Sequence, residues 1–157
     1  MNLKNYTSSV SVTNSINKIE HRLVSAGATH IVKLYDEEQT LTGITFQIAV
    51  GDNPLLFKLP AKAESVFNVL WGEVRRPRPE TKKNVQQQAA RTAWKLLSDL
   101  PTGQAGWVDI QINLIKIEQV ELLEVFLPYC WDPSTDKTYF DKLKESKFKA
   151  LAQYTES

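Results

Sequence analysis

The chain has 157 residues, of which 42% are hydrophobic and 24% are charged, and its formal net charge is +1. This length fits one domain with its own core, and this composition argues against wholesale disorder. No apolar run reaches the roughly 18 residues of a membrane span, and the N-terminus lacks the pattern of a secretory signal. The single cysteine, Cys130, cannot form an internal disulfide. We therefore expect a cytoplasmic protein.

Strand and helix patterns alternate over the first part of the chain. Residues 6–12 alternate at a period of two, which predicts a strand. A helix is predicted from about Thr13 to Gly27, because capping residues precede an apolar stripe at helical spacing. The stripe consists of Ile16, Ile19, Leu23 and Val24.

A β region follows this helix. Residues 29–36 predict one strand, and a polar turn leads to a second strand that places Ile44, Phe46, Ile48 and Val50 on one face. Gly51 to Pro54 form a strong turn signal. Leu55, Phe57 and Leu59 continue the apolar face, so three of the predicted strands are consecutive.

The second half is predicted to be helical. A helix over 63–71 is followed by a linker at 75–79, which Pro77 and Pro79 keep out of helical conformation. The next helix is predicted to start at Pro79 and to end before 101–103. Residues 107–126 contain no Gly or Pro and predict one long apolar helix, and a short helix is predicted around 139–153.

These elements predict an α+β fold. The expected order is a β-α-β-β-β, mostly antiparallel sheet with one covering helix, followed by a helical C-terminal half. We expect a single domain over 1–157, with a sheet-plus-helix part at 1–62 and a helical part at 63–157. The apolar excess of the 107–126 helix also predicts a homo-oligomer that assembles through it.

Residues 71–95 carry a cluster of positive charge, because their only acids are Glu73 and Glu80. The remainder of the chain is therefore net acidic. Arginine and lysine in such a cluster suit phosphate groups. Alternatively, the window is a solvated loop, or it holds a small phosphorylated ligand rather than a polymer. The candidate phosphate-binding residues are Arg75, Arg76, Arg78, Lys82, Lys83, Arg91 and Lys95.

Two tryptophans flank this window. Trp71 and Trp94 are candidates for stacking on bases, although a tryptophan on the shoulder of an apolar stripe is more often an anchor at the edge of the core. Lys33 and Lys58 face away from the apolar side of their strands. They either line a groove on the open sheet face or are ordinary exposed lysines.

No residue pattern indicates catalysis. His21, His30 and Cys130 have no zinc-site spacing, and the loop at 132–136 lacks the ligand density of a calcium site. We therefore predict no metal, no cofactor and no catalytic residue, and we regard the protein as more likely a binding protein than an enzyme.

Several short phrases resemble an uncharacterised family of small proteins encoded by bacteriophages, prophages and mobile elements. The phrases are Lys4-Asn5-Tyr6-Thr7, Gly27-Ala28-Thr29, Phe57-Lys58-Leu59-Pro60, Ala90-Arg91-Thr92-Ala93-Trp94-Lys95 and Val125-Phe126-Leu127-Pro128-Tyr129. The resemblance implies a bacterial host cytoplasm and a role in handling nucleic acid or in conflict with host defence. It implies no catalytic residue.

The leading hypothesis from the sequence is a non-enzymatic nucleic-acid-binding accessory protein of a phage or mobile element. One alternative is an oligomeric sponge that binds a small signalling nucleotide and counters host defence. Another is a protein–protein inhibitor or scaffold that acts through the long apolar helix.

Overall fold

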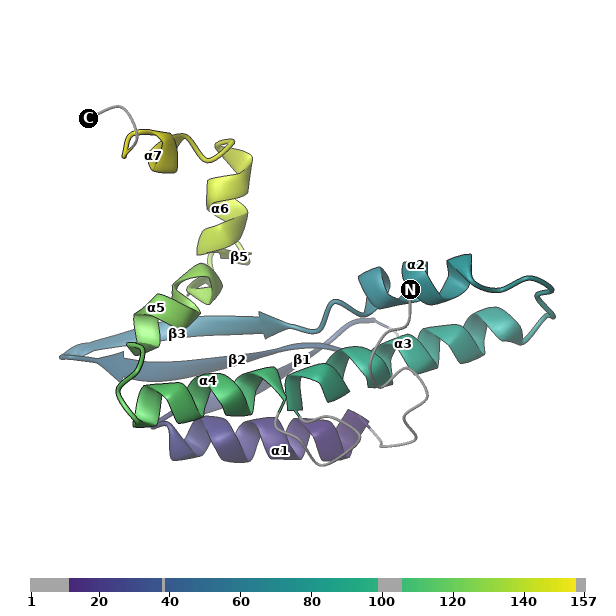
Figure 1. Cartoon of the computed structure of the whole chain (residues 1–157), viewed down its shortest axis with the longest axis horizontal. Helices are drawn as coiled ribbons and strands as arrows, with labels where there is room; N and C mark the ends of the chain where they lie inside the picture. The colour runs from purple at the N-terminus through teal and green to yellow at the C-terminus, as the bar shows by residue number, and fades with distance from the viewer. Residues whose placement is uncertain (1–11, 38, 99–105, 155–157) are drawn as a thin grey trace. The chain divides into compact units, whose positions relative to one another are not determined.

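The computed structural model describes residues 12–37, 39–98 and 106–154, and these form an α+β fold (Figure 1). The described residues separate into two compact units, each built from two stretches of the chain. The helical unit lies within Met1–Ala26 and Pro60–Ile117, and the sheet unit lies within Gly27–Leu59 and Glu118–Ser157. The boundary expected near residue 62 does not coincide with these units, because the first helix groups with later helices.

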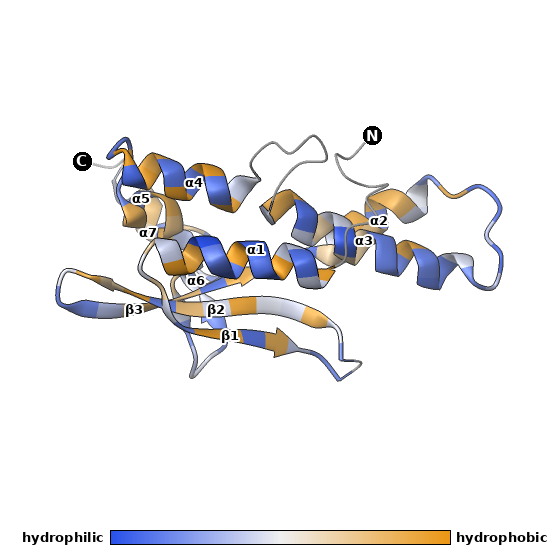
Figure 2. Cartoon of the chain, turned by 90° about the horizontal axis from the view of Figure 1, so that it is seen from below, coloured by the Kyte–Doolittle hydropathy of each residue, from blue (hydrophilic) through white to orange (hydrophobic). Residues whose placement is uncertain are grey.

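The helical unit contains α1 (Val12–Ser25), α2 (Ala63–Gly72), α3 (Thr81–Ser98) and α4 (Trp107–Lys116). Helix α3 packs against the other three, and α1 also packs against α4. The stripe predicted on α1 is largely confirmed, because Ile16, Ile19 and Leu23 are at most 2% exposed. Val24, by contrast, is 58% exposed. Figure 2 shows this helix with alternating hydrophobic and hydrophilic residues.

The core of the helical unit includes the second half of α3. Trp94 is completely buried, and Ala89 and Ala93 on the same helix are also buried. Small residues at these positions allow neighbouring helices to approach closely. Helix α4 contributes Val108 and Ile112, both 1% exposed.

The sheet unit contains an antiparallel sheet in the order β1 (Thr29–Tyr35), β2 (Leu41–Val50) and β3 (Asn53–Pro60). Asp36 stabilises the first turn, because its side chain accepts a hydrogen bond from the Thr40 backbone N–H at 2.9 Å. Gly51 has a φ of +62° in the second turn, a conformation that glycine adopts easily. The apolar face predicted for β2 is confirmed by the burial of Ile44, Phe46 and Ile48, but the alternation is incomplete because Thr45 between them is only 4% exposed.

The predicted order of the sheet is not confirmed. The strand predicted at 6–12 lies outside the described residues, except for Val12, which begins α1. In the described part of the chain, a helix therefore comes first, and the sheet formed by the following strands has three strands rather than four.

Three aromatic rings form the core of the sheet unit. Phe46 and Phe57 stack with their centroids 5.4 Å apart, and Phe126 meets both edge-on at 6.0 and 6.1 Å. Phe126 ends α5 (Leu122–Phe126) and is 1% exposed. Offset and edge-on arrangements are the favoured geometries for aromatic pairs. Burial of this ring therefore holds α5 against two strands of the sheet.

The C-terminal half is mostly helical, as predicted, but it also contains two short strands. After a 3₁₀ turn (Leu127–Tyr129), β4 (Trp131–Asp132) and β5 (Lys137–Thr138) form a small hairpin. The helix predicted around 139–153 is divided into α6 (Tyr139–Glu145) and α7 (Lys149–Ala152). Lys147 and Phe148 separate them with φ values of +54° and +59°, which a continuous helix excludes.

The single long helix predicted at 107–126 is also wrong. Helix α4 ends at Lys116, Glu118 has a φ of +60°, and Glu121 precedes α5. The Glu121 backbone N–H donates to the Glu124 carboxylate at 3.0 Å, so these two acids cap a new helix. The expected homo-oligomer thus has no continuous helix to assemble through. Within the described ranges, no helix is long and apolar enough to span a bilayer.

Replacing Phe126 with Ala is expected to lower the free energy of unfolding by about 3–5 kcal/mol, because it leaves a cavity beside Phe46 and Phe57. Urea denaturation followed by circular dichroism measures this loss. Leu127→Ala is the matched control, since Leu127 is the next residue and is 43% exposed. The control is expected to lose about 1 kcal/mol or less. Equal losses in the two variants would contradict the role of the ring cluster.

Candidate functional site

A cluster of exposed cations surrounds the connection between α2 and α3. We call it the tip cluster: Arg75, Arg76, Arg78, Lys82 and Lys83, all exposed. Pro77 and Pro79 keep the connection out of helical conformation, as predicted. Helix α3 begins at Thr81 rather than at Pro79, because the Thr81 hydroxyl accepts a hydrogen bond from the Arg78 backbone N–H at 2.9 Å. Figure 2 shows the connection as mostly hydrophilic.

The tip cluster is not neutralised by the protein itself. None of its side chains forms an ion pair with any residue in the described ranges. The first turn of α3 has no acidic residue, and Glu80, which directly precedes the helix, is the one acid beside the tip cluster at this helix start. Positive side chains and the positive end of the helix dipole therefore coincide, and both favour an anion at this place.

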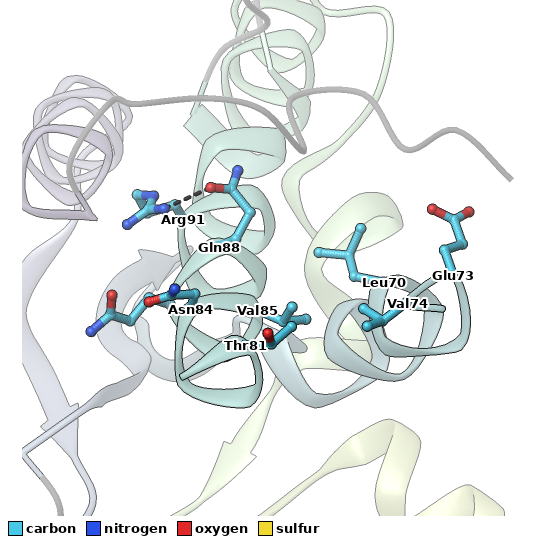
Figure 3. A pocket seen from close by; sticks show the side chains of 9 residues that line it. Leu70, Glu73, Val74, Thr81, Asn84, Val85, Gln88 and Arg91 are labelled. Carbon is cyan, nitrogen blue, oxygen red and sulfur yellow. Dashed lines mark hydrogen bonds between the residues drawn. The ribbon is translucent and has the colours of Figure 1, made fainter. Parts of the chain in front are cut away.

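An open groove of about 520 Å³ lies beside the tip cluster, between α2 and the exposed face of α3 (Figure 3). Its apolar part consists of Leu70, Val74 and Val85. The polar residues recur at helical spacing along α3, from Thr81 near the tip to Arg91 farther along the helix. They are Thr81, Asn84, Gln87, Gln88 and Arg91, and Glu73 adds an acid from the end of α2.

Arg91 lies at the end of the groove that is farther from the tip. Its guanidinium donates a hydrogen bond from Nη2 to Gln88 Oε1 at 2.6 Å. Its Nε is buried and has no hydrogen-bond partner among the described residues. A buried donor without a partner costs about 1–3 kcal/mol.

Two predicted site residues are not on the surface. Trp94 is fully buried, and Lys95 is only 4% exposed. The predicted stacking role of Trp94 and the predicted phosphate contact of Lys95 are therefore both corrected. The physical reason is that α3 packs against three helices, so its second half is covered on more sides than one apolar stripe requires.

Trp71 is partly exposed, and its ring stacks on that of Phe67, with centroids 5.7 Å apart and planes 17° apart. The pair is separated by one helical turn, which is the usual spacing for such contacts on a helix. The predicted stacking role of Trp71 on a ligand remains a prediction, and Trp71 does not line the groove.

The apolar part of the groove was not predicted. Val74 lies just after the end of α2 and Val85 lies on α3, so their approach depends on the packing of α2 against α3. The sequence does contain a signal for the polar face of the groove on α3. Thr81, Asn84, Gln88 and Arg91 are three to four residues apart and therefore share one face of the helix.

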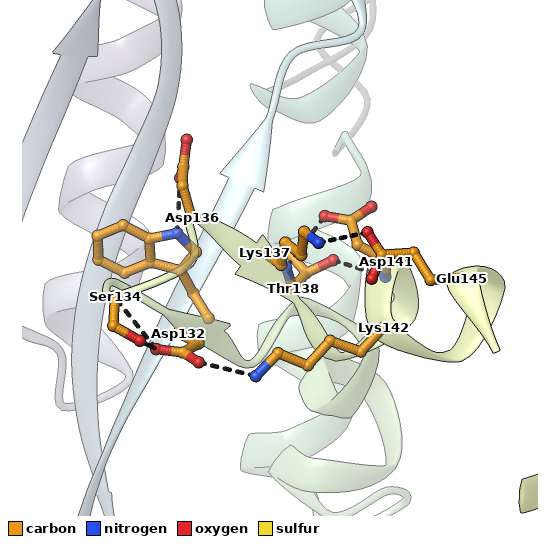
Figure 4. Close-up of polar contacts among 9 residues, drawn as sticks. Asp132, Ser134, Asp136, Lys137, Thr138, Asp141, Lys142 and Glu145 are labelled. Carbon is orange, nitrogen blue, oxygen red and sulfur yellow. Dashed lines mark hydrogen bonds and ion pairs between the residues drawn. The ribbon is translucent and has the colours of Figure 1, made fainter.

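A second polar cluster lies in the sheet unit (Figure 4). Asp136 accepts hydrogen bonds from Lys58 Nζ and Trp131 Nε1, each at 2.9 Å. The Lys58 ammonium also lies 6.0 Å from the centre of the Trp131 ring. Lys58 is therefore part of an ion-pair cluster that joins β3 to the β4–β5 hairpin, rather than an ordinary exposed lysine.

The second carboxylate of this cluster is Asp132. It accepts hydrogen bonds from Lys142 Nζ at 2.8 Å and from the Ser134 hydroxyl at 2.7 Å and backbone N–H at 3.0 Å. These bonds, led by that of Lys142, hold the pKa of Asp132 well below its usual range. Hydrogen bonds from Lys58 and then from Trp131 likewise lower the pKa of Asp136. Each carboxylate is thus engaged in holding the hairpin.

Neither catalysis nor metal binding gains support from the side-chain geometry. Burial raises the pKa of the Cys130 thiol, which disfavours the reactive thiolate. No group of three or more His, Cys, Asp or Glu side chains suited to a metal ion occurs among the residues that the structure describes.

Comparison with protein-family models, with curated proteins and with solved structures finds no match to this chain. The functional conclusion therefore depends on the geometry of the chain itself.

Acidification is expected to weaken the hairpin cluster. Because the folded pKa values of Asp132 and Asp136 lie below that of an unfolded aspartate, about 3.9, the contribution of both groups is present above that pH. It is lost as the pH falls through the folded values. Asp136→Asn should therefore lower the free energy of unfolding more at pH 7 than at about pH 3. Urea denaturation at both pH values measures the difference.

The control for this experiment is Asp52→Asn at the exposed turn between β2 and β3. The Asp52 carboxylate makes no hydrogen bond or ion pair with the described residues. Its effect on stability should be small and should not change with pH. A loss in Asp136→Asn that is equally large at both pH values would contradict the expected linkage.

Proposed function

We propose that this protein is a non-enzymatic nucleic-acid-binding protein whose tip cluster contacts the phosphate backbone. The observation that carries the proposal is the exposed group of arginines and lysines that lacks ion pairs within the described residues. A role as an accessory protein of a phage or mobile element is added only by the resemblance of the short sequence phrases.

The chemistry of the tip cluster suits a phosphate polymer. Arginine forks bind phosphate oxygens in a bidentate manner, and lysines supply further point charges. The cations lie on an exposed connection and a helix start rather than inside a closed cavity, so several successive phosphates can contact them. Such contacts release counterions, which makes the affinity depend on salt.

The small-nucleotide alternative is less well supported. A closed nucleotide pocket needs an aromatic ring beside a cation such as Arg91, and the buried indole of Trp94 cannot contact a ligand in the groove. The scaffold alternative relied on one long apolar helix, which is interrupted after Lys116. Five of the seven predicted phosphate-binding cations lie exposed in the tip cluster, which favours the polymer.

Replacing Arg75, Arg76 and Arg78 together with Ala is expected to weaken DNA binding and to flatten its salt dependence. Each lost phosphate contact reduces the slope of log K against log salt by about 0.9 for duplex DNA and about 0.7 for single strands. The slope should therefore become less steep by about 2–3. Fluorescence anisotropy with labelled DNA over a series of salt concentrations measures it.

The matched control is the triple variant Lys144→Ala, Lys147→Ala and Lys149→Ala. It also removes three positive charges, and these lysines are exposed and form no ion pair with described residues. The control should keep the wild-type slope. An unchanged slope in the arginine variant, or equal changes in both variants, would refute the proposed interface.

A further inference from the structure

The groove between α2 and α3 adjoins the tip cluster. Thr81 lines the groove and also binds the Arg78 backbone at the tip. From Lys82 to Arg91 the distance along the helix axis is roughly 13 Å, at about 1.5 Å per residue. A stacked nucleic-acid strand advances about 3.4 Å per nucleotide, so a segment of about four nucleotides spans the tip and the groove.

The lining of the groove differs chemically from the tip. Asn84 and Gln87 carry side-chain amides, which both donate and accept hydrogen bonds, and neither amide bonds to a described residue. A phosphate accepts hydrogen bonds only, whereas the edge of a base presents both donors and acceptors. Glu73 would repel a phosphate, but its carboxylate can accept a bond from the amino group of a base. The lining therefore suits a base better than a second phosphate.

The apolar part of the groove suits the face of a base. Leu70, Val74 and Val85 supply contact area at the α2–α3 junction. At the far end, the Arg91 guanidinium is oriented by its bond to Gln88 and retains a buried Nε without a partner. A guanidinium plane can stack on a base and donate to its acceptors. The volume of about 520 Å³ lies within the roughly 300–1,000 Å³ typical of small-ligand sites.

We infer that the groove binds an unpaired nucleobase while the tip cluster binds the adjoining phosphates, so that the protein prefers single strands to duplexes. This inference rests on the proposed function. In a duplex, each base is stacked on its neighbours and its pairing edge is occupied, so it must be unstacked and unpaired before it can enter the groove.

The test uses fluorescein-labelled DNA of about 12 nucleotides, as a mixed-sequence single strand and as the corresponding duplex, a length within the usual range of single-strand sites. The wild-type protein should bind the single strand at least about fivefold more tightly. The double variant Asn84→Ala with Gln87→Ala should lose about five- to tenfold in single-strand affinity and change duplex affinity by less than about twofold.

Gln86→Ala is the matched control for this variant. Gln86 is an exposed glutamine on the same helix, but it does not line the groove. It should bind both DNA forms like the wild type. Circular dichroism spectra of all variants check that each of them folds.

The outcomes separate the groove from the tip. If the arginine variant at the tip loses affinity for both single-stranded and duplex DNA while the groove variant loses affinity for neither, the proposed function stands and the base site is refuted. The base site is also refuted if the groove variant loses the same affinity for single-stranded and duplex DNA. If the wild type binds no DNA even at low salt, both proposals fail. If a free mononucleotide competes as well as the single strand, the groove is a small-nucleotide site instead.

Discussion

Helix α3 holds the helical unit together, because each of the other three helices in that unit packs against it. Its consecutive residues Thr92, Ala93, Trp94 and Lys95 are at most 7% exposed, which is possible only when a helix is covered on nearly all sides. The first half of the same helix is largely exposed and carries the groove and part of the tip cluster. The buried half therefore anchors the exposed half, and the side chains of the candidate site project from a fixed support.

The two units use their charged residues differently. In the sheet unit, Lys58 and Lys142 pair with Asp136 and Asp132, and Lys137 pairs with Glu145 at 2.5 Å. These charges hold a short hairpin that has little apolar surface of its own. The tip cluster has no such internal partners within the described residues, and its mutual repulsion is relieved only by water, salt or a bound anion. A nearly neutral protein can thus keep one strongly basic end.

Local patterns predicted the elements that depend on neighbouring residues. The turn at Gly51 and the prolines before α3 act within a few residues, and both of these features were predicted correctly. The errors concern features that packing decides. Lys95 was assigned to the surface because one apolar stripe was assumed. The break at Glu118 was missed because no Gly or Pro marks it, and its signal is the acid pair that caps α5.

The same limit applies to the candidate site. Exposure of Arg75, Arg76 and Arg78 followed from the prolines alone, whereas the groove needs Val74, just after α2, to meet Val85 on α3. That meeting depends on how the two helices pack, and periodicity within one segment carries no information about it. Burial of Trp94 was the more probable of its two interpretations, and the structure shows it to be complete.

The interleaved composition of the two units has a consequence for protein synthesis. Helix α1 emerges from the ribosome before the sheet strands, whereas α3 and α4 follow only after all three strands. Because translation proceeds at about 5–20 residues per second, the apolar stripe of Ile16, Ile19 and Leu23 stays exposed for several seconds before its partners in the same unit are synthesised. The apolar face of the sheet strands likewise stays exposed until Phe126 is synthesised. Each core can therefore be completed only after the intervening stretch of the other unit has been synthesised. Until then the nascent chain exposes two incomplete apolar surfaces at once, a state in which chaperone contact is most useful.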